Sequence, residues 1–205
     1  MKSLTAEQLD ALQEFINIGV GRAASMLTDM VDSRISLRIP VVRVYQAKQL
    51  RQELVKQFDH QRFSAVRLNF SGSLSGSAEL VFPTESAAAL VSVLTGEDPN
   101  SRDLDAVKIG TLSEIGNIVI NGVMGSISNL LRHQMNYKIP SYSENTIEHM
   151  LLSDYPVTDE TVFLLAQARF TIEQMQITGD IILIFEMRSF DALLEAIDRE
   201  LEVSR

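Results

Sequence analysis

The chain repeats itself after about 100 residues, and this duplication constrains its fold more than any other feature of the sequence. The early part of each half matches at an offset of 100 residues and the later part at an offset of 103. One insertion of three residues in the second half accounts for the difference. A chance match of Glu, Asn and Pro at one offset has a probability of about one in 10⁴. We therefore expect a single domain over residues 1–205, made of two repeats at about 1–100 and 101–205. The residues of the first half that recur 100 positions later include Leu12, Glu14, Asn17, Ile18, Ile39 and Pro40.

The first half contains signals for both helices and strands. Thr5 and Gln8 have the spacing of a capping box, which predicts the start of a helix. Pro40 interrupts an extended run, as suits a sheet edge or a bulge, and Gly96 ends a helical pattern. We expect, in order, a helix over about 5–30, an extended run over 35–45, a short helix over 47–58, hairpin strands over 63–70 and 76–82, and a helix over 85–94.

The second half repeats this order after a link at 95–101. The segment 143–158 is treated as an extra segment of unassigned form. The two helix–strand–strand–strand–helix units are expected to share one sheet, which gives a pseudo-symmetric α+β fold whose long helices carry the candidate sites. The expected elements are a helix over about 104–131, a strand near 135–142, hairpin strands over 161–170 and 175–186, and a helix over 189–201.

A polar stripe runs along each of the two long helices, opposite the apolar stripe. At 100° per residue, Glu14, Asn17 and Gly21 lie within about 40° of Asp10, whereas the apolar residues fall on the far side. The second helix places its corresponding residues at the same angles. Each rigid helix is therefore expected to present an exposed Glu–Asn pair. The second stripe comprises Gly110, Glu114, Asn117 and Asn121.

Two simpler interpretations of these pairs stay open at this point. The residues could be ordinary solvent-facing polar side chains. Glu114 could also serve a capping box with Thr111, if the helix began at Thr111 rather than near residue 104.

Composition excludes several classes of function. The formal net charge of −9 argues against a nucleic-acid partner, because phosphate binding relies on Lys and Arg. The absence of Cys excludes thiol nucleophiles and thiolate metal sites. His60, His133 and His149 have no ligand-like spacing, so we expect no metal or cofactor of the protein's own. No apolar run approaches the length of a membrane span, and we expect a cytoplasmic protein without membrane insertion.

The repeated pattern resembles the motif of the CheC/CheX/FliY phosphatases of bacterial chemotaxis, and the two-site arrangement is most similar to the CheC form. The family motif usually begins with Asp or Ser, which the first copy matches and the second, with Gly, does not. In this sequence the pattern reads Asp10-x3-Glu14-x2-Asn17-x22-Pro40 and Gly110-x3-Glu114-x2-Asn117-x22-Pro140.

This resemblance implies hydrolysis of the aspartyl phosphate on CheY or a CheY-like receiver domain. A side-chain amide does not titrate near neutral pH, so Asn17 and Asn117 are unsuited to act as bases or nucleophiles but are able to orient water. The resemblance implies that Glu14 and Glu114 pair with a Lys of the receiver. Any Mg²⁺ would belong to the receiver. Asp10, Gly21 and Asn121 are expected to support the two sites.

The strongest competing interpretation is a protein without catalytic activity. The same surface would serve an adaptor that binds a phosphorylated receiver, or that sequesters a signalling partner such as CheD. An interaction module of the flagellar switch is a third possibility. Faster loss of phosphate from a receiver in the presence of catalytic amounts of the chain separates the enzyme from the adaptor.

Overall fold

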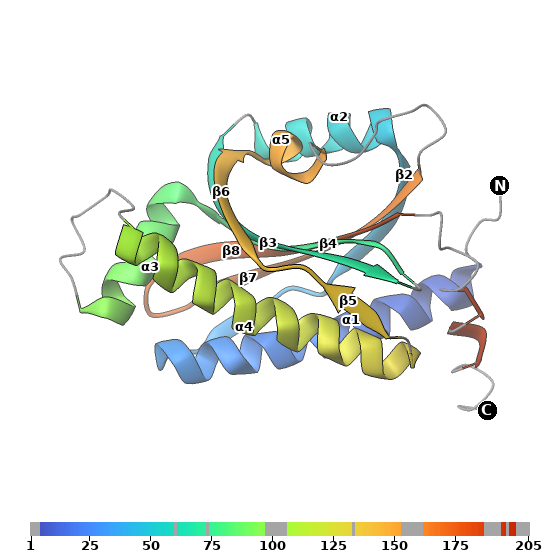
Figure 1. The fold of residues 1–205 in the computed structure, drawn as a ribbon, viewed down its shortest axis with the longest axis horizontal. Helices are drawn as coiled ribbons and strands as arrows, with labels where there is room; N and C mark the ends of the chain where they lie inside the picture. Colours follow the sequence, from blue (N-terminus) through green and yellow to red (C-terminus); the bar gives the residue numbers. More distant parts are fainter. Residues whose placement is uncertain are drawn as a thin grey trace.

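The protein folds around one eight-stranded sheet with helices on both faces. A computed structural model describes residues 5–59, 61–72, 74–96, 106–132, 134–152, 162–186, 194–195 and 197–199. The sheet lies between α1 and α4 on one face and α2 and α5 on the other (Figure 1). The expected α+β class with a shared sheet is therefore confirmed. Among the helices that the structure describes, none is long and apolar enough to cross a membrane.

The elements of the first half match the expected order. The capping box is present, because the Thr5 hydroxyl accepts from the Gln8 N–H at 3.2 Å and the Gln8 side chain accepts from the Thr5 N–H at 3.0 Å. The extended run is divided at Pro40 into two strands. Gly96, with φ of 72°, caps the last helix. These elements are α1 (Ala6–Val31), β1 (Ile35–Leu37), β2 (Val41–Gln46), α2 (Ala47–Phe58), β3 (Arg62–Gly72), β4 (Gly76–Pro83) and α3 (Thr84–Thr95).

The second half repeats these elements and corrects one expectation. The part of 143–158 that the structure describes is not an extra segment: residues 143–146 belong to β6 and 147–152 form α5, which correspond to β2 and α2, and residues 153–158 lie outside the described residues. The expected link at 95–101 lies outside the described residues beyond Gly96, and so does most of the last expected helix, of which 194–195 and 197–199 are helical. The second set is α4 (Ala106–Leu131), β5 (Met135–Tyr137), β6 (Ser141–Thr146), α5 (Ile147–Leu152), β7 (Val162–Ile172) and β8 (Ile177–Glu186).

The two halves exchange strands within the sheet. The central order is β1-β7-β8-β4-β3-β5, with β2 also paired to β7 and β6 to β3. Strands β1 and β2 of the first half thus pair with the second half, whereas β5 and β6 of the second half pair with the first. All of these pairings are antiparallel. The sheet is consequently a joint product of both repeats.

The helices α1 and α4 form an antiparallel pair whose apolar stripes are buried, as expected. Figure 1 shows the two helices running in opposite directions beneath the sheet. Small residues allow close contact: a Cβ on Gly19 would lie 3.0 Å from the Val123 carbonyl oxygen, and one on Gly122 would lie 2.6 Å from the Met26 sulfur. The fully buried stripe residues include Leu12, Ile16, Val20, Ala23, Leu27, Leu112, Ile120, Val123 and Ile127.

Candidate functional site

The long helices present both Glu–Asn pairs at the surface. Glu14 and Glu114 are exposed, and Asn17 and Asn117 are half-buried at the edge of the exposed stripe. Asp10, one turn before Glu14, is also exposed. We call Glu14 and Asn17 on α1 the first site, and Glu114 and Asn117 on α4 the second site. The helices bring together the residues of each site because their spacings of three and four residues return to one face.

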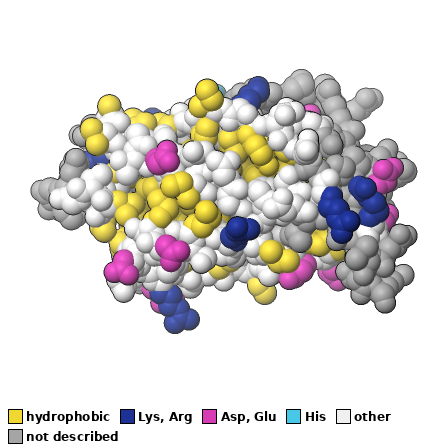
Figure 2. All heavy atoms as spheres, turned by 60° about the horizontal axis from the view of Figure 1, so that its bottom comes forward, with side chains coloured by type: hydrophobic (Ala, Val, Ile, Leu, Met, Phe, Trp, Pro, Cys, Tyr) yellow, Lys and Arg dark blue, Asp and Glu magenta, His cyan; other side chains and the backbone are white. Residues whose placement is uncertain are grey.

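The surface around the helix pair mixes apolar groups with charged groups of both signs. Figure 2, turned so that the side of α1 and α4 comes forward, shows hydrophobic side chains gathered in patches on this face, with acidic and basic side chains around them. Ile18, next to Asn17, is 45% exposed. A face of this kind suits contact with another protein better than contact with a polyanion.

The sites occupy opposite halves of the helix pair. Gly19 on α1 lies against Val123 and Ile127 on α4, so Asn17 lies level with the C-terminal part of α4. Asn117 is about ten residues nearer the start of α4, which corresponds to about 15 Å along the helix. A single phosphoryl group is too small to contact both amides, so each pair forms a separate site.

The structure rejects the capping-box interpretation of Glu114. Helix α4 already runs from Ala106, and the Thr111 hydroxyl donates a hydrogen bond to the Val107 carbonyl at 3.0 Å, as a residue inside a helix does. Glu114 therefore lies within the helix, and its carboxylate points from the exposed face.

A hydrogen bond distinguishes the two sites. The Asn121 side chain donates from Nδ2 to Oδ1 of Asn117 at 2.7 Å, one helical turn away. In the first half Gly21 occupies the position of Asn121, and within the described part of the chain Asn17 makes no side-chain hydrogen bond. The i,i+4 spacing of two Asn residues is the sequence signal for this contact. The first amide is thus freer to rotate than the second.

Gly21 and Gly110 lie at open positions on the two exposed stripes. A Cβ built on either residue meets nothing within 4 Å. Packing between α1 and its neighbours in the described structure therefore does not require glycine at position 21, and the open surface leaves room for a partner's backbone.

Gly21→Ala is expected to raise the free energy of unfolding by about 0.5–1 kcal/mol, because alanine restricts the unfolded chain and meets no clash in α1. The matched change Gly116→Ala should lower stability, by about 1–3 kcal/mol, since its Cβ would lie 2.4 Å from Cβ of Val66 on β3. Urea denaturation of both variants measures the difference. A lower free energy of unfolding for Gly21→Ala would mean that position 21 is packed against another group rather than open.

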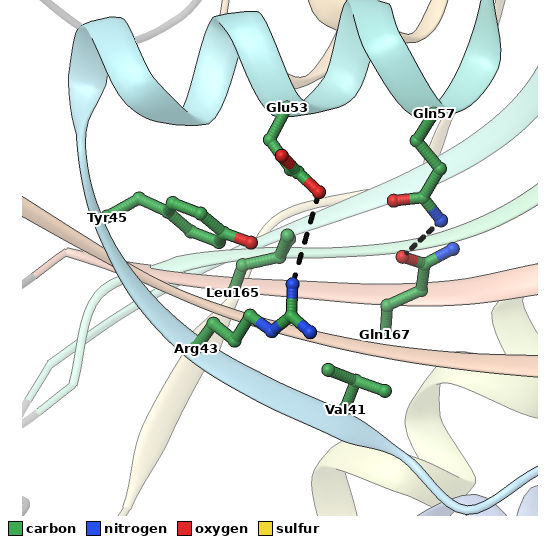
Figure 3. Close-up of a pocket in the computed structure, with 7 residues that line it drawn as sticks. All are labelled: Val41, Arg43, Tyr45, Glu53, Gln57, Leu165 and Gln167. Atoms are coloured by element: carbon green, nitrogen blue, oxygen red, sulfur yellow. Dashed lines mark hydrogen bonds and ion pairs between the residues drawn. The ribbon is translucent and has the colours of Figure 1, made fainter.

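A small pocket lies on the other side of the sheet, between β2, β7 and α2. Its volume is about 190 Å³. Figure 3 shows the Arg43 guanidinium facing Glu53 at 3.9 Å and the Gln57 amide donating to Gln167 at 2.8 Å. A hydrogen bond with Tyr45 raises the pKa of Arg43 above its ordinary value, with the nearby Glu53 acting in the same direction. These polar side chains are already hydrogen-bonded or ion-paired to one another, so they leave few donors or acceptors for a ligand.

Sequence reasoning missed this pocket because residues 41–57 of the first half meet residues 165–167 of the second, more than 100 positions away. In the described residues no three His, Cys, Asp or Glu side chains lie together as a metal site would require. His149 is exposed, and its Nδ1 lies 3.1 Å from the Asn145 amide nitrogen; His60 and His133 lie outside the described residues. The helix pair therefore carries the stronger candidate sites.

Comparison with known proteins confirms the resemblance found in the sequence. No family model matches the chain. The chain is similar to the CheY-P phosphatase CheC of Bacillus subtilis (strain 168), with 28% identity over 142 residues, which make up 67% of this chain and 66% of that protein. The chain therefore spans just under two thirds of that relative's length.

Solved structures share the fold over nearly the whole chain. FliY of Thermotoga maritima superposes with a TM-score of 0.75 at 20% identity, covering 97% of this chain and 100% of that one. FliM in the FliM–SpeE complex from H. pylori gives 0.69 at 11% identity, covering 97% and 98%. CheX of Vibrio vulnificus gives 0.59 at 18% identity, covering 84% and 99%. The chain therefore shares the fold of FliY, FliM and CheX.

Proposed function

We propose that the chain is a phosphatase that hydrolyses the aspartyl phosphate of CheY or a CheY-like receiver domain. The observation that carries this proposal is the presentation of two equivalent Glu–Asn pairs on the exposed faces of two antiparallel helices. The similarity to a CheY-P phosphatase supports the same activity. Each rigid helix would enter the receiver's active site from outside.

The amides of Asn17 and Asn117 orient the attacking water in this mechanism. The amide oxygen accepts a hydrogen bond from the water. This bond directs a lone pair of the water oxygen at phosphorus, in line with the bond between phosphorus and the aspartyl oxygen. A bond forms between the water oxygen and phosphorus as the bond from phosphorus to the aspartyl oxygen breaks, and the protons of the water pass to the released phosphate and to solvent. The products are inorganic phosphate and the unphosphorylated Asp side chain of the receiver. The receiver's own Mg²⁺ and cationic groups stabilise the charge on the phosphoryl oxygens, and the phosphatase chain contributes position rather than a base.

The carboxylates of Glu14 and Glu114 dock the receiver by pairing with one of its Lys side chains. Each lies one turn from the water-orienting Asn on the same face, so this ion pair fixes how far and at what angle the amide enters. Asp10 adds negative charge one turn before Glu14 on α1. Gly21 leaves space for the partner's backbone.

Glu14→Gln is expected to raise KM for the phosphorylated receiver about two- to fivefold, with kcat changed by less than about twofold, because an exposed ion pair contributes mainly to binding. The measurement uses a chain with Asn117→Ala, so that only the first site turns over. The effect should shrink in about 0.5 M salt, which screens exposed charges. The control is Asp29→Asn, an exposed acidic residue of α1 off the Glu–Asn face. A fall in kcat without a change in KM would contradict the docking role.

The test of the proposed function is the rate at which a phosphorylated CheY-like receiver loses its phosphate when the molar ratio of the chain to the receiver is about one to twenty. An enzyme turns over many receivers and shortens the lifetime of the whole phosphorylated population. A chain that leaves this lifetime unchanged, or lengthens it, is not a phosphatase for that receiver.

A non-catalytic adaptor is the second candidate function. The observation that favours it is the shared fold with FliM, whose solved structures include complexes with SpeE and with FliG. In this alternative the same helix faces bind a phosphorylated receiver, a CheD-like signalling protein or a flagellar-switch protein without hydrolysis. In the decay measurement described above the adaptor would leave the lifetime unchanged, and in excess over the receiver it would lengthen the lifetime.

A further inference from the structure

In the first helix and strands of each half few residues are identical, and most of these lie at the surface. In the later strands the identical residues, such as Phe70 and Phe170, belong to the core. Between residues 6–46 and 106–146 only seven positions are identical. Leu12 belongs to the core, whereas Glu14 and Ile18 are exposed and Asn17 is half-buried. Exposed positions in a duplicated chain diverge freely unless a shared function constrains them. The seven are Ala6, Leu12, Glu14, Asn17, Ile18, Ile39 and Pro40.

Ile39 and its counterpart Ile139 are the most exposed large hydrophobic residues in the described structure. Ile39 is 72% exposed and Ile139 is 91% exposed. A single exposed isoleucine needs no explanation, since apolar atoms form much of any protein surface. The same exposed residue at the same position in both halves does need one.

The backbone holds both isoleucines in fixed positions. The N–H of Arg38 donates to the Arg169 carbonyl at 2.9 Å, and the N–H of Lys138 donates to the Asn69 carbonyl at 2.9 Å, so the residue before each isoleucine is tied to a central strand in the same way. The proline that follows each isoleucine restricts its backbone to extended conformations. The side chains are therefore presented rigidly, which lowers the entropy cost of binding.

Both isoleucines lie on the helix side of the sheet, close to the sites. Ile35 and Leu37 pack into the core beneath α1. Alternation is interrupted after β1, because Arg38 bonds to Arg169 and Val41 pairs with Gln167, so Ile39 and Pro40 together stand opposite the single residue Ala168. Ala168 belongs to the core beneath the helices, which places this bulge on the helix side. In the second half the Tyr137 hydroxyl hydrogen-bonds to Ser128 of α4. Two further extended residues cover about 6.6 Å, which places Ile139 about four helical residues closer to Asn117. Each isoleucine thus falls within the footprint that a protein partner makes around a Glu–Asn pair.

We propose that Ile39 and Ile139 are apolar anchors that dock the phosphorylated receiver, Ile39 at the first site and Ile139 at the second. This inference rests on the proposed function for the identity of the partner. Each anchor inserts into an apolar surface of the receiver next to its phosphorylated Asp. Exposed ion pairs contribute little affinity, whereas a buried aliphatic side chain near the centre of an interface contributes much more. The Glu fixes orientation, and the isoleucine supplies most of the binding.

The test uses chains with one active site each. With Asn117→Ala present, Ile39→Ser should raise KM for the phosphorylated receiver at least about tenfold while kcat stays within about twofold. With Asn17→Ala present, Ile139→Ser should do the same at the second site. The matched control is Val93→Ser, which changes an apolar residue of α3 that is 48% exposed. The Ile39→Ser and Ile139→Ser variants should unfold at the urea midpoint of their parent chain, because the replaced side chains are largely exposed.

A binding titration separates failure of this inference from failure of the proposed function. The receiver activated with beryllofluoride, which mimics the phosphoryl group, is titrated against each chain without any turnover. If the chain does not hydrolyse the phosphate but Ile39→Ser and Ile139→Ser still weaken binding tenfold, the docking role stands and catalysis fails. Unchanged KM and binding in the serine variants overturn the docking role, as does a receiver that does not bind at all. The docking role is also overturned if the chain self-associates in sedimentation and the serine changes abolish only that association.

Discussion

Replacing Asn17 and Asn117 together by alanine is expected to slow receiver dephosphorylation by at least about 10²–10³-fold while leaving the fold intact. The loss corresponds to removing one preorganised hydrogen-bonding group from a site that excludes water. Both amides lie half-buried on helix surfaces, and alanine favours a helix more than asparagine does, so stability should not fall. The measurement is the decay rate of the phosphorylated receiver, with circular dichroism as a check of folding. A folded double variant with nearly full activity would reject both residues as the catalytic groups.

Single replacements show how the two sites share the activity. If Gly110, which departs from the motif, weakens the second site, Asn17→Ala should cost more activity than Asn117→Ala, and the reverse order would contradict that inference. The hydrogen bond from Asn121 to Asn117 is present only in the second site and provides an independent difference between the sites. The matched control is Asn129→Ala, an exposed amide near the end of α4.

Removing Arg67 is expected to lower the free energy of unfolding by about 3–5 kcal/mol, because it leaves the carboxylate of Glu79 charged within the protein interior. The two residues face each other across the central strands β3 and β4, with Arg67 Nε 2.7 Å from Glu79 Oε1. Their side chains are 9% and 1% exposed. Urea denaturation of Arg67→Ala gives the change directly.

A surface pair and a double replacement serve as controls for this prediction. Arg34 and Glu173 lie 3.8 Å apart with side chains 83% and 43% exposed, so Arg34→Ala should change stability by less than about 1 kcal/mol. Replacing Arg67 by Met and Glu79 by Leu together should recover most of the lost stability, since no buried charge remains. Equal effects of Arg67→Ala and Arg34→Ala would mean that water reaches the buried pair.

Much of the fold could be predicted from the sequence because its elements carry local signals. The capping box at Thr5 and the glycine at position 96 mark helix ends within about a residue of their observed places. The pairing of β1 and β2 with β7 could not be predicted, because hydrophobic alternation identifies a strand but not its neighbour. The expected extra segment was wrong for a related reason. Residues 143–146 are polar and give no strand signal, and the helical spacing of Ile147, Met150 and Leu151 covers only six residues of helix. The pairing of β6 with β3 and the contact of α5 with α2 identify these elements.

The candidate sites were accessible to sequence reasoning because helical periodicity converts residue spacing into a shared face. It placed Glu14 and Glu114 on exposed stripes, where the structure has them. Their chemical roles stay predictions that kinetics must test. Periodicity gave no indication of Ile39 and Ile139, since an exposed isoleucine and a buried one look alike in a sequence. The buried charges of Arg67 and Glu79 are similarly hidden, because charged residues in strands usually face water.

The exchange of strands between halves has a consequence for synthesis on the ribosome. Strands β1 and β2 are made early, but their partner β7 is completed only at Ile172. Until then the nascent chain holds an unpaired edge and an uncovered apolar helix face, so final assembly waits for the last strands to emerge. Gene fragments encoding one repeat alone should accordingly yield insoluble or chaperone-bound polypeptide, although each repeat contains a nearly complete set of elements.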